Sequence, residues 1–236
     1  MEPAVADFRE TYRAQISRSY HGVLHGLAVL TFGIAGLVWA LWFWGLPGWF
    51  QIPVIAANLV FANFAIYFIH KELGHRLRGF AKLFYQRHAK EHHRFFSPSA
   101  IAWQSPRDLR VVFFPLPLLF VVMAASAGVG FGVESLGVAD AHASAVFFTT
   151  VGYYLAYETT HFCDHLPEGH PITSIPGLHY MRAHHRGHHD PRHMHRMNFN
   201  IVFPLADWVL GTLVPRSELL ASSPDRSSAD DEAPSS

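Results

Sequence analysis

Long apolar runs without a charged residue are the strongest pattern in this chain. No Lys, Arg, Asp or Glu occurs in residues 19–69, and residues 26–44 and 52–69 each approach the roughly 20 helical residues that cross a hydrocarbon core. Residues 111–133 form a third uncharged run, and residues 141–157 form a fourth, shorter one. Helices of a soluble bundle would each show a polar face. The pattern therefore predicts an all-α integral membrane protein with four transmembrane helices in two hairpins.

Turn and helix-breaking residues fit this division. The sequence GLPGW at residues 45–49 separates the first two runs, as expected of a turn. Pro115 and Pro117 stand near the start of the third run. Because proline lacks an N–H and clashes with the preceding helical turn, we expect these two residues to bend or delay the third helix.

The basic residues indicate how the helices are oriented. All 18 Lys and Arg residues lie before the first run, between the second and third runs, or after the fourth. The connections at residues 45–51 and 134–140 contain none. Loops rich in Lys and Arg are typical of the cytoplasmic side of a membrane. We therefore expect a multi-pass protein with both termini cytoplasmic and a helical, histidine-rich cap on that side.

Three regions are predicted along the chain. In residues 1–20, apolar side chains recur every three or four positions, which favours either an interfacial membrane helix or a helix packed on the rest of the protein. Residues 21–216 form the predicted membrane-embedded domain. Residues 217–236 are rich in Ser, Asp and Pro, so we expect a disordered tail.

Composition narrows the class of protein. Only 15% of the residues are charged, whereas about a quarter would be usual in a soluble domain. Because 18 basic residues balance 18 acidic ones, no overall field favours nucleic acid, and no nucleic-acid partner is expected. Cys163 is the one cysteine, which excludes an internal disulfide and a Cys-rich zinc site.

The candidate chemistry lies in the 18 histidines. Four clusters follow the ends of the second and fourth apolar runs: HKELGH at 70–75, HAKEHH at 88–93, HFCDH at 161–165 and HHRGHH at 184–189. His161 and His165 are four residues apart, so their rings share one face of a helix. His70 and His75 are five apart, and they share a face only if the helix loosens or ends there.

Metal coordination explains such a set of histidines best. Protonated together they would repel, and buried neutral rings need partners for both nitrogens. A metal ion binds the neutral imidazole and supplies the charge. Imidazole suits zinc, iron, copper and nickel, but ten candidates exceed the four ligands of a structural zinc site. Two ions with about five nitrogen ligands each would keep open positions, which suits oxygen activation.

Charged residues accompany the histidine clusters. We expect nearby carboxylates either to accept the second ring N–H of the ligands or to be ordinary surface groups; they are Glu72, Glu91, Glu158 and Asp164. The basic residues of the same segments are expected to attract an anionic lipid headgroup or an acidic electron-transfer partner; they are Lys71, Arg76, Lys90, Arg182 and Arg186.

The order of these boxes on paired hairpins resembles the fatty acid hydroxylase / sterol desaturase superfamily of non-haem di-iron membrane oxygenases. The resemblance covers about residues 50–215 and is closest in YETTHFCDH, YMRAHHRGHH and NFNIVFPLADWVLGTLVP. It implies two iron ions, O2 as co-substrate, and hydroxylation or desaturation of a C–H bond in a membrane lipid. Fatty acid 2-hydroxylases often carry a fused cytochrome b5 domain. No segment here is long enough for one, so the implied electron donor is a separate protein of the ferredoxin or cytochrome b5 type.

Carried over box by box, the resemblance implies the iron ligands His70, His75, His88, His92, His93, His161, His165, His185, His188 and His189. The second box departs from the family pattern. That pattern is usually HxxHH and would need a histidine where this chain has Ala89, whereas His88 stands one residue further away, as in acyl desaturases. His179 and His184 are the reserve candidates.

Two other functional classes fit the histidine positions less well. A haem-binding electron carrier would place its ligands inside the spans, facing one another. A metal transporter would line a path through the membrane with His, Asp or Glu. Here the clustered histidines lie at the ends of the apolar runs and in the loops beyond them.

Overall fold

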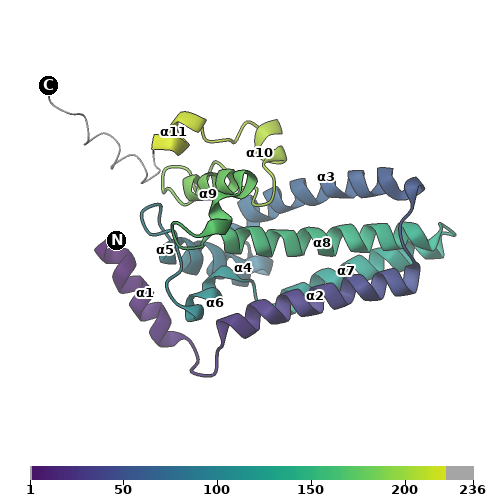
Figure 1. Ribbon diagram of the computed structural model, residues 1–236, viewed down its shortest axis with the longest axis horizontal. Helices are drawn as coiled ribbons and strands as arrows, with labels where there is room; N and C mark the ends of the chain where they lie inside the picture. Colours follow the sequence, from purple (N-terminus) through teal and green to yellow (C-terminus); the bar gives the residue numbers. More distant parts are fainter. Residues whose placement is uncertain (1, 222–236) are drawn as a thin grey trace.

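The computed structural model describes residues 2–221 and consists of helices, with no strand among these residues. Four long helices form an elongated bundle, and shorter helices gather at one end of it as a cap (Figure 1). The long helices are α2 (Gly22–Trp44), α3 (Ile52–Phe68), α7 (Leu116–Ser135) and α8 (Asp140–Asp164). Both the start of the described chain and the last described helix lie at the cap end.

The bundle is built around α8, which contacts α2, α3 and α7. Its core contains Val29, Leu119, Phe147 and Val151. The outward faces of the other three helices remain apolar and exposed; examples are Leu24, Phe61 and Val121. An apolar exterior around an apolar core is the pattern of a bundle surrounded by lipid.

Among the described residues, three helical segments are long and apolar enough to cross a membrane: Gly22–Trp44, Trp49–Gly74 and Leu116–Ser135. The predicted fourth span, residues 141–157, is not among them. It lies inside α8, whose polar side chains find partners within the bundle: Asn58 donates to Thr150, and Asn63 donates to the Tyr153 hydroxyl. A fourth crossing therefore stays a prediction.

Proline delays the third long helix, as the sequence predicts. The short helix α6 (Leu109–Val112) ends before Phe113, whose backbone is extended, and α7 begins at Leu116, one residue after Pro115. The backbone carbonyls of Val111 and Val112 thus lie at the break. Pro115 has no N–H to pair with the Val111 carbonyl in an α-helix, which leaves that carbonyl available.

The cap joins two segments that each follow a pair of long helices. The first contains η2 (Ile69–Gly74), η3 (Gly79–Ala81), α4 (Lys82–Tyr85), η4 (Gln86–His92), α5 (His93–Phe95), η5 (Pro106–Asp108) and α6. The second contains η6 (Pro171–Ser174), α9 (Pro176–His188), α10 (Leu205–Val209) and α11 (Arg216–Ala221). A short η1 (Trp49–Gln51) precedes α3 at the opposite end of the bundle.

The N-terminal helix α1 (Pro3–Gln15) packs on the cap. Tyr12 is buried against Phe95, and the buried Arg9 donates to the Phe95 carbonyl at 2.8 Å. Arg13 forms a two-point ion pair with the buried Asp108, at 2.7 and 2.8 Å. Of the two arrangements expected for residues 1–20, these contacts are those of a helix packed on the protein.

The predicted disordered tail begins too early. Residues 217–221 belong to α11, and Leu219 is buried beside Gly187 of α9. Burial of this apolar side chain against α9 favours the helix over a disordered segment. Residues 222–236, the rest of the predicted tail, lie outside the described residues.

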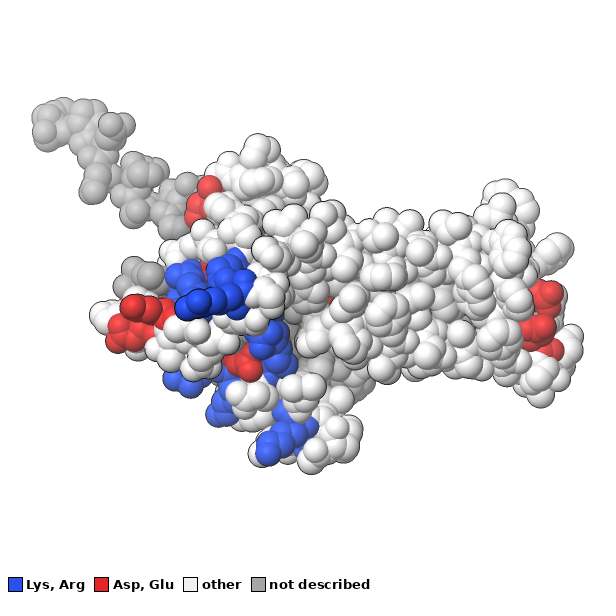
Figure 2. All heavy atoms as spheres, turned by 90° about the horizontal axis from the view of Figure 1, so that it is seen from below, with Lys and Arg blue, Asp and Glu red and all other residues white. Residues whose placement is uncertain are grey.

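On the face of the described residues that Figure 2 shows, charge is confined to the two ends. Figure 2 shows Lys and Arg on the cap, an uncharged surface along the bundle, and acidic residues at the far end. Glu134 and Asp140 flank the connection between α7 and α8 at that end. The absence of Lys and Arg from the visible bundle surface agrees with the charge asymmetry of the sequence.

Candidate metal centre

Nine of the ten predicted ligands form two groups of converging ring nitrogens. Cluster A consists of His70, His75, His88, His93 and His188, and cluster B consists of His92, His165, His185 and His189. Within each cluster one ring nitrogen from every member lies within 4.8 Å of all the others. The tenth, His161, lies beside cluster B, with its Nε2 3.2 Å from the His92 Nε2.

The two reserve candidates lie outside these clusters. His184 is buried, with its Nε2 3.4 Å from a carboxylate oxygen of Asp207. His179 is exposed on α9. The sequence spacing of His184 and His188 did not distinguish them, because both positions are compatible with an inward-facing ring on the same helix.

Consecutive histidines in the HH pairs separate into different clusters. His92 belongs to cluster B and His93 to cluster A, while His188 belongs to cluster A and His189 to cluster B. Neighbouring side chains on a helix point in different directions, so one HH pair reaches two sites at once. Each half of the protein thereby contributes one ring to the cluster made mainly by the other half.

Cluster A depends on two π-helical segments. His70 lies in η2 and His75 follows its last residue, while His88 lies in η4 and His93 follows its last residue. Both segments have π-helical geometry. The wider turn brings residues five apart onto the same side. The loosened helix that the five-residue spacing required is therefore present, and it also accommodates Ala89 between His88 and the HH pair. Gly74 permits this packing, because a Cβ there would lie 2.9 Å from the His88 ring.

Backbone carbonyls hold six of the ten rings through Nδ1. The carbonyls of Phe199 and Met197 accept from His70 and His188 of cluster A. Around cluster B, the Val111 carbonyl accepts from His92 and the Val112 carbonyl from His161. The Ile101 carbonyl accepts from His165 and the Phe96 carbonyl from His189. Such contacts fix the orientation and the tautomer of each ring. The Val111 carbonyl is the one left without a helical partner at Pro115.

This bonding leaves the Nε2 atoms facing one another as acceptors. His92 and His189 both donate Nδ1–H to carbonyls, yet their Nε2 atoms lie 3.1 Å apart. His92 and His161 repeat the arrangement at 3.2 Å. A neutral imidazole has one donor and one acceptor nitrogen, so neither Nε2 has a proton to share with the other. A cation between the lone pairs resolves this conflict, and the residues therefore fit a bound metal ion.

Burial keeps these rings neutral. It lowers the pKa of His92 to about 3, against the opposing effect of the Val111 carbonyl. The pKa values of His88, His185 and His188 lie well below the ordinary histidine value, first because of burial and then because of neighbouring histidines. Since metal ions bind the neutral ring, no proton has to be displaced near pH 7.

A buried polar network, which the sequence reasoning missed, positions the carbonyls of cluster A. Asp207 is fully buried and accepts from the backbone N–H groups of Phe199 and Asn200, at 2.9 and 2.7 Å. Asn63 of α3 donates to the Phe203 carbonyl and accepts from the Ala206 N–H. These bonds attach residues 198–207 to α3. The sequence signal was the polar NFN and LAD triplets within an otherwise apolar segment.

The expected carboxylate partners of the histidines have other roles. Glu72 pairs with Arg76 and Arg78, and Glu91 pairs with Arg87. Glu158 accepts from the Tyr154 hydroxyl at 2.7 Å.

The carboxylate oxygens of Asp164 are buried without a hydrogen-bond partner among the described residues. The prediction that acidic side chains orient the rings is therefore wrong for the six carbonyl-bound histidines. The interruption of the helix between α6 and α7 and the cap loops already present carbonyls to these rings, so no carboxylate has to be buried for that purpose.

Most of the basic residues expected to attract an anion have partners within the protein. Arg76 pairs with Glu72, and both Arg182 and Arg186 pair with Glu168. Lys71 donates to the Tyr67 hydroxyl at 3.1 Å. Lys90 makes no ion pair with a described residue and lies over the ring of Tyr85.

Comparison with known proteins agrees with this geometry. The sequence model of the family described as fatty acid hydroxylase matches residues 55–212, which is more than half of the chain and includes all ten histidines. No curated protein and no solved structure matches the chain. On the family match, the protein belongs to the fatty acid hydroxylase family, within the fatty acid hydroxylase / sterol desaturase superfamily.

Proposed function

We propose that this protein is a non-haem di-iron membrane oxygenase that uses O2 to hydroxylate a C–H bond of a membrane lipid. Family membership supports a lipid oxidoreductase, and the histidine clusters support a metal site. The observation that carries the proposal is the convergence of buried, neutral imidazoles whose Nε2 atoms face one another as acceptors.

Two iron ions account for the full set of rings. Cluster A would hold one ion with five histidines, and cluster B with His161 would hold the other with five. Five nitrogen ligands leave room at each ion for a further ligand. When bound, the iron pair supplies the redox chemistry of O2 activation, whereas the protein positions the substrate and excludes water.

The proposed membrane orientation places the cap in the cytoplasm. Four spans would form two hairpins, α2 with α3 and α7 with α8, and both hairpins would open toward the cap. The basic residues of the cap support this orientation. Both termini would then be cytoplasmic.

A small cavity against the histidine rings and a larger apolar groove nearby support a lipid substrate. A cavity of about 10 Å³ lies where rings of both clusters meet the break before α7; its lining includes His88, His92, His161, Phe113 and Phe114. In addition, an apolar groove of about 610 Å³ beside α9 and α10 is lined by Met181, Phe203 and Trp208, among others. We propose that a lipid chain reaches the clusters from this end of the bundle and presents one C–H bond to the small cavity.

Desaturation by the same site is the alternative outcome. Addition of one oxygen atom gives an alcohol, whereas loss of a second hydrogen gives an alkene. The placement of the lipid chain relative to the iron decides between them, and the family match includes no finer distinction.

Metal content and lipid products test the proposal together. Lipid extracts from cells with and without the gene are compared by mass spectrometry for a gain of one oxygen or a loss of two hydrogens. His188→Ala is the test variant, because His188 belongs to cluster A and is held by the Met197 carbonyl. We expect the variant to insert in the membrane normally, to lose about one iron per chain, and to form no product.

Arg196→Ala, at an exposed residue of the cap, is the matched control and should retain iron and product. Full product formation by His188→Ala, or a purified wild-type protein that binds no iron, would refute the proposal.

A further inference from the structure

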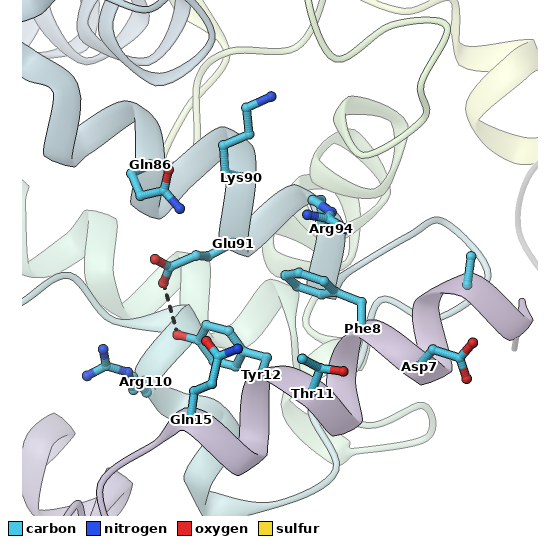
Figure 3. Close-up of a pocket in the computed structure, with 11 residues that line it drawn as sticks. Asp7, Phe8, Thr11, Tyr12, Gln15, Gln86, Lys90, Glu91, Arg94 and Arg110 are labelled. Atoms are coloured by element: carbon cyan, nitrogen blue, oxygen red, sulfur yellow. Dashed lines mark hydrogen bonds between the residues drawn. The ribbon is translucent and has the colours of Figure 1, made fainter.

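A groove of about 810 Å³ lies along the junction between α1 and the helical segment that carries the second histidine box (Figure 3). Thr11 and Tyr12 of α1 line one wall. Lys90 and Arg94, from η4 and α5, line the facing wall, and Arg110 of α6 lies at the end near Gln15. The groove lies on the surface of the cap, away from the clusters described above.

The groove carries an excess of positive charge. Lys90, Arg94 and Arg110 form no ion pair with any described residue, and Arg94 lies over the Phe8 ring at 4.3 Å. Glu91 is neutralised by Arg87 and accepts from the Tyr12 hydroxyl. Asp7 is the remaining acid of the lining, and it lies at the end opposite Arg110. The groove thus suits a partner with an acidic surface.

The helical segment that carries the basic residues of the groove also carries ligands of both clusters. Lys90 and Arg94 stand on the same short segment as His88, His92 and His93, whose rings point to the other side. One helix, roughly 10 Å across, therefore separates the groove from the histidine clusters.

Aromatic rings connect the groove to cluster B. The Tyr12 ring lies 5.5 Å from that of Phe95, which lies 4.9 Å from that of Phe96. The Phe96 ring stacks on His165 with 4.0 Å between centroids. Since electron transfer slows steeply with the gap between groups, this continuous packed path allows transfer from the groove to cluster B.

The groove is held open by fixed contacts. Arg9 attaches α1 to the Phe95 and Ala102 carbonyls, and Arg13 attaches it to Asp108. Arg9 is almost fully buried, at 1% exposure, so this attachment is part of the protein core. A preformed groove saves the entropy of ordering its walls when a partner binds.

We propose that this groove docks a small, acidic electron-transfer protein. The inference rests on the proposed function, which requires a reductant. Insertion of one atom of O2 into a C–H bond, with the other atom leaving as water, consumes two electrons and two protons. The docked protein is oxidised by one electron in each of two encounters, and the protons come from water.

Binding affinity tests the proposal without relying on turnover. The full chain in phosphatidylcholine nanodiscs is titrated with three soluble acidic donors, a plant-type [2Fe–2S] ferredoxin, the cytochrome b5 haem domain and a flavodoxin. Basic cytochrome c serves as the opposite-charge control. At least one acidic donor should bind, with an affinity that falls as salt rises, because charge attraction is screened.

A matched pair of charge reversals locates the site. Arg94→Glu should weaken binding by about tenfold or more at low salt, because it places a like charge opposite the donor. Arg196→Glu changes the net charge equally but lies outside the groove lining, and it should change affinity by less than about twofold. Equal effects of the two variants, or no salt-dependent binding by any of the three donors, would overturn the proposal.

An anionic lipid is the competing occupant of this groove. If phosphatidylglycerol in the nanodisc displaced every donor, and Arg94→Glu abolished that displacement, the groove would belong to a lipid headgroup and the proposal would be overturned. Two further measurements, iron content and product formation with dithionite as reductant, distinguish failure of the docking proposal from failure of the proposed function. If both persist while docking is absent, only the docking proposal fails, whereas loss of iron binding in the wild type removes the proposed function itself.

Discussion

Clusters A and B take their ligands from corresponding places in the two halves of the chain, but from different backbone geometries. In cluster A, His70 and His75 are five residues apart; His70 lies in a π-helix and His75 follows its last residue. In the C-terminal half, His161 and His165 are four apart, at the last turn of α8. A wider helical turn compensates for one additional residue. In each half the two histidines of the first pair therefore lie on one side of their helix, although they are five residues apart in one half and four in the other.

The two clusters also differ in what orients them. The carbonyls that accept from cluster A come from residues 197 and 199, in the C-terminal half. Those around cluster B come from residues 96–112, in the N-terminal half. Each half therefore orients rings of the cluster supplied mainly by the other. Because of this exchange, the geometry of each cluster depends on both halves of the chain. The carbonyls that orient cluster A are nevertheless different from those that orient cluster B.

Removal of metal from both clusters should have the largest effect. Without a cation, acceptor nitrogens about 3 Å apart face each other in a buried space. Binding of a ligand at a thousand times its Kd contributes about 4 kcal/mol of stability per site. Chelation should therefore lower the Tm by roughly 10 °C for each site emptied. Differential scanning fluorimetry before and after 1,10-phenanthroline, and after re-addition of Fe(II), measures this; an unchanged Tm would contradict it.

Single ligand losses should separate the clusters. His88→Ala removes a ligand of cluster A, and His165→Ala removes one of cluster B. Each variant should keep about one iron per chain and lose product at least about 100-fold, because the proposed reaction requires both ions. Iron is counted by mass spectrometry of the purified protein, and Mössbauer spectra identify the remaining site. Identical spectra from the two variants would show that the clusters do not hold separate ions.

Substitution of residues that hold the ring-orienting carbonyls should give smaller, cluster-specific effects. Asp207→Asn weakens the bonds that hold the Phe199 carbonyl near His70, so the affinity of cluster A for iron should fall by about 10- to 100-fold. Arg9→Met releases the loop whose carbonyls, from Phe96 and Ile101, orient cluster B, and should lower the affinity there by a similar factor. Competition with a metal-binding dye follows both affinities. Equal loss from both clusters in either variant would argue for general destabilisation.

Correction of the helical register should have the smallest effect. Deleting Ala89 changes the second box to the spacing HxxHH, so that His88 and His93 become four residues apart and share one side of an ordinary α-helix. We expect this variant to keep both ions and most of its activity. Deleting Arg186 instead shortens the α-helical spacing between His185 and His189 and should empty cluster B. Iron stoichiometry distinguishes the two deletions, and circular dichroism verifies that both variants keep their helices.

The sequence alone determined the helical class, the positions of the long apolar segments and the choice of the ten histidines as candidate ligands. These features depend on local properties: apolar runs match the length of a membrane crossing, and histidine clusters are too dense for a core or a surface. The delay at Pro115 was likewise predictable, because the loss of a backbone donor is a property of that residue alone. The start of the predicted tail was not, because the burial of Leu219 depends on α9.

Only the tertiary structure decided how the rings are shared. His92 and His93 are adjacent in sequence and belong to different clusters, while His184 is excluded from both and lies near Asp207. The carbonyls that orient the rings carry no side-chain signature, so no residue type in the sequence marks them. Likewise, the basic groove exists because α1 packs beside the second histidine box, some 80 residues away along the chain. Ring direction, carbonyl position and groove all depend on contacts between distant segments, which spacing within a single segment does not encode.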